Sequence, residues 1–120
     1  MSLQQDIQIH QGEAVLIPLT IYSDESKTAF KSLGGASIDY RIGFEGSLVL
    51  RITRTPNANG SSTSIIDPSN GGALINLRQA DTLALQACRY IHQVIVTDSA
   101  GKPNVVTDGF LDVLETLPDA

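Results

Sequence analysis

Apolar and polar residues alternate with a period of two along most of the chain. Successive side chains of a β-strand point to opposite faces of the sheet, so this pattern is typical of strands that bury one face. A short first strand is expected around Ile7 and Ile9. The pattern further predicts inward-facing rows at Val15/Ile17/Leu19/Ile21, Ile38/Tyr40/Ile42/Phe44, Leu48/Leu50/Ile52 and Leu111/Val113. Two more runs alternate in the same way, Ala73/Ile75/Leu77 and Tyr90/His92/Val94/Val96, and Tyr90 is expected to face inward.

Turn-forming residues separate these predicted strands. Residues 45–47 (Glu-Gly-Ser) indicate a tight hairpin, and residues 67–72 and 98–103 indicate further turns. Residues 22–35 and 56–63 are rich in turn formers and are expected to be loops. Pro18 lies on the outward phase of its strand, and its nitrogen cannot donate a hydrogen bond. That strand is therefore expected at a sheet edge or at a bulge.

Only residues 79–87 break the strand pattern. Asp81 is expected to cap a short helix by accepting hydrogen bonds from its first free amides. The apolar residues that would share one face of this helix are Ala80, Leu83, Ala84 and Ala87. With about 7–8 short strands at regular spacing and one short helical turn near residues 80–87, the chain is predicted to be an all-β, antiparallel β-sandwich.

Length and charge narrow the possible functions. The chain has 120 residues, which fits a single domain over residues 1–120, and residues 1–3 read like a leader added in cloning. The formal charge is −5 and the basic residues are scattered, which argues against nucleic-acid binding and against an anionic membrane surface. No stretch is apolar enough to span a bilayer, and the first ten residues lack the pattern of a signal peptide.

The residue types that usually carry chemistry do not form a recognisable site. No serine lies in a nucleophile elbow. His92 lies in mid-strand and is expected to be a half-buried residue with a local hydrogen-bond partner, and His10 is expected to be solvated. Cys88 is the single cysteine, so no intrachain disulfide can form, and it is interpreted as a small buried hydrophobe. No catalytic, cofactor-binding or metal-ligating residue is therefore assigned.

Acidic residues and glycines have plainer interpretations. Aspartates flank turns, where they can bond their own following backbone, and no run supplies the convergent oxygens that calcium requires. The residues concerned are Asp24, Glu25, Asp67, Asp98 and Asp108. Gly34 and Gly35 precede a strand rather than a helix, so they do not form a phosphate cradle. Residues 59–61 match a glycosylation sequon, which is interpreted as chance in a chain without a secretory signal.

The order of these signals across nearly the whole chain resembles one protein family. The matching pieces are Gln11-Gly12, Leu33-Gly34-Gly35-Ala36, the turn and strand from Asp67 to Leu77, Asp81-Thr82-Leu83-Ala84-Leu85, Tyr90, Asp98 to Gly101, and Gly109-Phe110-Leu111-Asp112-Val113. Together they resemble the immunoglobulin-like domains of phage tails, typified by the N-terminal domain of siphophage baseplate upper protein. That family usually carries Gly where this chain has Cys88, which would cost strain if the position required positive φ.

The resemblance implies an immunoglobulin-like fold and a non-enzymatic structural role in a phage or prophage virion. It also implies other tail or baseplate proteins as partners, copies repeated around the tail axis, location in the virion tail after synthesis in the bacterial cytoplasm, and no cofactor. The alternative is a non-catalytic carbohydrate-binding module on the same fold. It ranks lower because the chain has no Trp and because Tyr40 and Tyr90 are predicted to face inward. A third interpretation, an enzyme with a carboxylate pair, has no pair identifiable by spacing.

Overall fold

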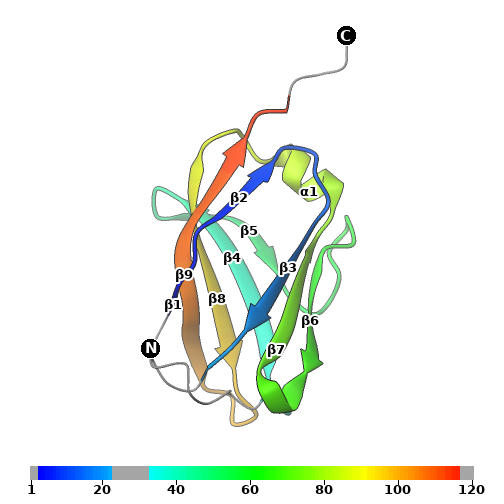
Figure 1. The fold of residues 1–120 in the computed structure, drawn as a ribbon, viewed down its shortest axis with the longest axis vertical. Helices are drawn as coiled ribbons and strands as arrows, with labels where there is room; N and C mark the ends of the chain where they lie inside the picture. The colour runs from blue at the N-terminus through cyan, green and yellow to red at the C-terminus, as the bar shows by residue number, and fades with distance from the viewer. Residues whose placement is uncertain (1–2, 23–32, 117–120) are drawn as a thin grey trace.

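Two β-sheets pack face to face in the computed structural model, which describes residues 3–22 and 33–116 (Figure 1). The larger sheet has the strand order β1-β9-β8-β4-β5, with β2 also pairing with β9, and the smaller sheet has the order β3-β7-β6. The strands are β1 (Leu3–Gln4), β2 (Ile7–His10), β3 (Val15–Thr20), β4 (Ser37–Phe44), β5 (Ser47–Ile52), β6 (Ser62–Asp67), β7 (Gly72–Leu77), β8 (Arg89–Thr97) and β9 (Pro103–Leu114). A 3-10 turn, η1 (Pro68–Asn70), and one helix, α1 (Gln79–Ala84), complete the described elements.

The prediction of an all-β sandwich is confirmed. The strand order matches that of an immunoglobulin-like fold. In the smaller sheet β3, β7 and β6 correspond to strands B, E and D of that fold, and in the larger sheet β4, β8 and β9 correspond to strands C, F and G. Pairing is antiparallel except where β1 and β2 run parallel to β9. This parallel contact joins the start of the described chain to its end, and no local sequence signal indicates it.

The predicted inward rows form most of the core. Ile17, Ile42 and Ile75 from the two sheets are buried. The other buried members of the rows are Leu19, Ile21, Ile38, Tyr40, Ile52, Ala73, Leu77, Tyr90, His92, Val94, Val96, Leu111 and Val113. Ile95, on the opposite phase of β8, is buried as well, but it lies outside the core cluster, because the register of β8 against β4 continues without a shift from Val94 to Val96.

Two residues of the predicted rows, Phe44 and Leu48, are instead exposed, by 42% and 60%. The tight hairpin predicted between them is present, with Glu45 and Gly46 both at positive φ. However, the register of β4 against β5 shifts between Ile42 and Gly43, so Leu48 pairs with Gly43 rather than following the phase of Ile42. The bulge therefore places Leu48 on the outer face of the sheet.

The prediction for the helix was wrong about both its cap and its buried face. The helix starts at Gln79, after Arg78, so Asp81 lies inside the first turn. Asp81 and Thr82 are buried, whereas the predicted apolar face is exposed. The residues of that face are Ala80, Leu83, Ala84 and Ala87.

Asp81 is buried because its carboxylate forms hydrogen bonds with the loop that precedes β6. Its carboxylate accepts hydrogen bonds from Asn57 Nδ2 at 2.9 Å, from Asn59 Nδ2 at 2.8 Å and from the hydroxyl of Ser61. Burial by itself would raise the pKa of Asp81, but the hydrogen bonds, first that from Ser61, lower it overall. The loop predicted at residues 56–63 is thus tied to α1 by contacts between residues far apart in sequence.

Candidate docking groove

His92 was predicted to be half-buried but is fully buried, and its two hydrogen-bond partners are distant in the sequence. Its Nε2 lies 2.5 Å from the carbonyl oxygen of Gln5, and its Nδ1 lies 2.8 Å from the hydroxyl of Tyr40. Because a carbonyl only accepts, Nε2 carries the proton and Nδ1 accepts from Tyr40. Burial lowers the pKa of His92 and raises that of Tyr40. The pair therefore acts as a structural link that fixes the segment before β2 against β8 and β4.

The other residues considered for chemistry do not come together. His10 is exposed at the end of β2, and Cys88 is half-buried before β8. Glu45 is the one non-glycine residue with positive φ in the described chain, so Cys88 avoids the strain considered for it. Within residues 3–22 and 33–116, no group of three or more His, Cys, Asp or Glu side chains could hold a metal ion.

Asp98 bonds its own following backbone, as turn chemistry predicts, whereas Asp67 bonds a side chain. Asp98 Oδ1 accepts from the amides of Ala100 and Lys102, at 3.0 and 2.9 Å. Asp67 accepts from the side chain of Asn70 at 3.1 Å. Asp24 and Glu25 lie outside the described residues.

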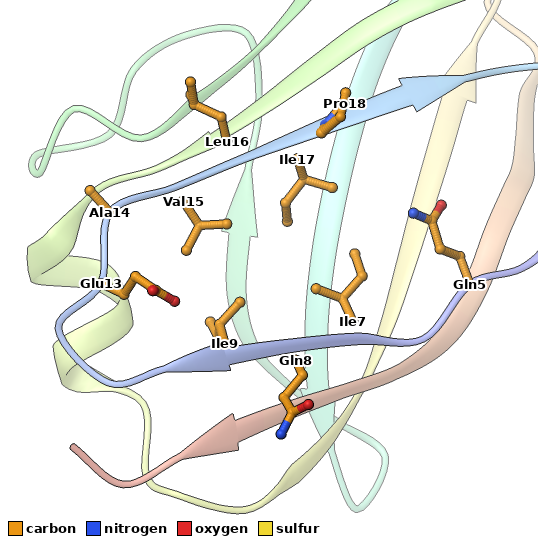
Figure 2. A pocket seen from close by; sticks show the side chains of 10 residues that line it. All are labelled: Gln5, Ile7, Gln8, Ile9, Glu13, Ala14, Val15, Leu16, Ile17 and Pro18. Atoms are coloured by element: carbon orange, nitrogen blue, oxygen red, sulfur yellow. The ribbon is translucent and has the colours of Figure 1, made fainter.

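A groove of about 440 Å³ runs between β2 and β3, where the edges of the two sheets face each other (Figure 2). Ile7 and Ile9 from β2 point toward Val15 and Ile17 from β3, and these four side chains form an apolar floor. Gln5 and Glu13 lie toward its two ends, while Leu16 and Pro18 point away from the floor. The remaining lining residues are Gln8 and Ala14.

Both walls of the groove are strand edges. β2 pairs with β9 and β3 pairs with β7, and neither has a neighbour on its other side in the described chain. The edge position predicted for the strand of Pro18 is confirmed. The β3–β7 ladder passes Pro18 without a register shift, so the proline nitrogen faces the free edge, where no bond to β7 is lost.

The free edge of β3 can accept an added strand. Backbone groups alternate along an antiparallel strand, so Leu16 and Thr20 present their N–H and C=O groups on the same side as Pro18. Pro18 offers its carbonyl alone. An extended peptide could pair with these groups and place alternate side chains over the apolar floor, as in strand addition to sheet edges.

No protein-family description and no curated protein matches the sequence. In the described part of the chain, no helix is long and apolar enough to cross a membrane. The sequence indicated the edge through Pro18, but it gave no signal that β2 would cross to the other sheet and open a groove beside it.

Proposed function

We propose that this chain is a structural protein of a phage or prophage virion, a tail or baseplate module that assembles with other tail proteins and catalyses no reaction. The immunoglobulin-like strand order supports the family resemblance. So do the turn glycines of the resembling motifs: Gly12 and Gly101 adopt φ values of 78° and 84°, which favour glycine. Gly12 and Gly101 of these motifs therefore lie at turn positions whose backbone conformation favours glycine.

The groove between β2 and β3 carries the proposal. Its occupant is an extended segment of a neighbouring tail protein, because only an extended backbone can use the alternating free groups of β3. The apolar floor favours apolar side chains at every second position of that segment. Because Pro18 has no N–H group, the segment's carbonyl opposite it receives no hydrogen bond from β3, and the bonds there come from Leu16, Thr20 and the Pro18 carbonyl.

The carbohydrate-binding alternative has less support. Stacking on a sugar requires exposed aromatic faces, and Tyr40 and Tyr90 are buried. Phe44 and Phe110 are 42% and 37% exposed, but the ring of Phe44 packs against that of Tyr90, with centroids 5.9 Å apart, and the guanidinium of Arg89 lies 4.6 Å from the ring centroid of Phe110.

The role in the virion is tested on purified particles from the parent phage or prophage. Mass spectrometry is expected to detect this protein at a fixed ratio to the other tail proteins. Particles that assemble normally and contain none of it would refute the proposal.

The groove is tested by a photo-crosslinking amino acid at Leu16, on the groove edge, with Ile66 on the opposite edge of the same sheet as the control. Both side chains are 62% exposed, so they differ in place rather than in accessibility. Adducts to one tail protein are expected from position 16 in assembled particles and not from position 66. Equal labelling at both positions, or none at position 16, would contradict docking in the groove.

A further inference from the structure

The outer face of the larger sheet, which points away from the core, carries an apolar row. Gly43 pairs with Leu48 on one side and with Ile91 on the other, and Ile91 pairs with Phe110. These four residues therefore lie side by side across β5, β4, β8 and β9. Leu48, Ile91 and Phe110 are 60%, 52% and 37% exposed. A contiguous exposed apolar row is typical of an interaction surface.

A hollow interrupts this row at Gly43, which has no side chain. It measures about 300 Å³ and its lining includes Leu48, Ile91 and Gln93. Phe110 and Gly43 lie on opposite sides of β8, each one strand away from it. Phe110, with the guanidinium of Arg89 over one face of its ring, and the hollow thus lie at equal distances on the two sides of the central strand.

The neighbouring row has a matching arrangement of charges. Gln93 on β8 pairs with Asp108 on β9 and with Arg41 on β4. An acid and a base therefore lie on opposite sides of the same strand, again at equal distances.

The charges named on this outer face sum to zero, three arginines (Arg41, Arg51 and Arg89) against three aspartates (Asp39, Asp108 and Asp112), although the whole chain carries −5. Asp39 pairs with Arg41 at 3.0 Å and with Arg51 at 2.9 Å, and Arg89 pairs with Asp112 at 2.7 Å. Two acidic molecules repel each other least where such a face meets its copy.

We propose that the outer face binds a second copy of this chain about a two-fold axis running along β8, past Ile91 and Gln93. A half-turn about that axis exchanges the positions of β9 and β4, because neighbouring strands are evenly spaced at about 4.8 Å. Phe110 then enters the hollow at Gly43 of the second copy, and Asp108 faces Arg41 of the second copy. Ile91 and Gln93 meet their own counterparts.

The occupant is a second copy because the face complements itself. A two-fold interface requires that each contact occur twice, with the roles of the two molecules exchanged. The row of Ile91 satisfies this condition because Phe110 of each copy meets the hollow at Gly43 of the other. The row of Gln93 satisfies it because Asp108 of each copy meets Arg41 of the other. Only these two rows need to match, since twisted sheets diverge away from the axis.

Sedimentation equilibrium of the isolated protein and of two charge-reversal variants tests the pairing. Wild type is expected to form a dimer as its concentration rises. Asp108→Arg places Arg opposite Arg41, and Arg41→Asp places Asp opposite Asp108, so each variant alone is expected to dimerise at least about tenfold more weakly. Mixed together, the two variants restore both opposite-charge contacts and are expected to form a heterodimer. Lys102→Asp, in the β8–β9 turn, controls for the net charge of Arg41→Asp, because both substitutions lower it by two.

Three results would overturn the proposal: a wild type that stays monomeric up to about 1 mM, variants that dimerise like wild type, or a mixture no more associated than its components. Because Arg41 also pairs with Asp39, folding of each variant is checked by thermal melting. Ile91→Lys gives an independent test, since it places two like charges on the axis without altering an ion pair. It should prevent dimerisation, whereas Leu83→Lys, on exposed α1, should not. These measurements use the isolated protein, so their outcome does not depend on the proposed virion role.

Discussion

The hydroxyl of Tyr40 donates a hydrogen bond of 2.8 Å to Nδ1 of His92 inside the sandwich. The two residues come from adjacent strands, and their rings meet edge to face, with centroids 5.7 Å apart. Nε2 of His92 in turn donates a hydrogen bond to the carbonyl oxygen of Gln5, just before β2. This chain of bonds fixes the strand that forms one wall of the docking groove.

Tyr40→Phe should lower the free energy of unfolding by about 1–3 kcal/mol. The substitution keeps the ring but leaves Nδ1 of His92 as a buried acceptor without a donor. Urea unfolding monitored by circular dichroism measures the change. A loss below about 0.5 kcal/mol would mean that this hydrogen bond contributes little to stability.

Stability should fall as the pH is lowered through the His92 transition. Burial holds the pKa of His92 below its ordinary value, so the unfolded chain binds a proton at a higher pH than the folded chain does. The stabilisation is complete above about pH 6.5, the ordinary histidine pKa, and is lost as the pH falls through the lower folded-state value. Unfolding free energies measured between pH 7.5 and 5 are expected to decrease in wild type.

The two histidines provide the control for this pH dependence. His92→Gln should be less stable at neutral pH and should show a flatter dependence in the same range. His10→Gln should keep the wild-type slope, because His10 is exposed. If His10→Gln removed the pH dependence of stability and His92→Gln left it intact, the dependence would come from His10 and the prediction for His92 would be wrong.

Ile42→Ala should destabilise the fold by about 2–5 kcal/mol, because Ile42 is completely buried and its truncation leaves a cavity. Leu48→Ala removes a side chain of similar size from the next strand. It should cost less than about 0.5 kcal/mol, because Leu48 faces outward. Chemical denaturation of both variants measures the difference. Equal losses would show that the bulge between Ile42 and Gly43 is misplaced.

Gly109→Ala should be much more damaging than Gly101→Ala. Both glycines have positive φ, so both substitutions introduce backbone strain. At Gly109, however, a Cβ would also collide with the carbonyl oxygen of Gln5, whereas at Gly101 nothing lies within 4 Å. The loss of unfolding free energy at Gly109 should exceed that at Gly101 by at least about 1 kcal/mol. Similar losses in thermal melts would contradict close packing of the Gln5 segment against β9.

The sequence by itself determined most of the strands, most of their inward faces and the turns, but neither β1 nor the start of β6 at Ser62, which lies inside the loop predicted at residues 56–63. The features that it determined follow from local physics, since the period of two follows from strand geometry and the hairpin at residues 45–46 from turn chemistry. Pro18 marked an edge strand because a missing amide hydrogen excludes it from a central position. The edge position of β3, which forms one wall of the groove, could therefore be predicted from Pro18 alone.

Tertiary structure decided the features that depend on distant partners. The helical periodicity of α1 predicted a shared apolar face that includes Ala80 and Leu83. Asp81 is buried instead, because Asn57, Asn59 and Ser61 from another loop donate hydrogen bonds to its carboxylate. The parallel pairing of β2 with β9, the groove beside it and the outward turn of Leu48 depend on contacts between strands rather than on any local pattern. Such contacts exist only once the two sheets have assembled, because residues far apart in sequence must first be brought together.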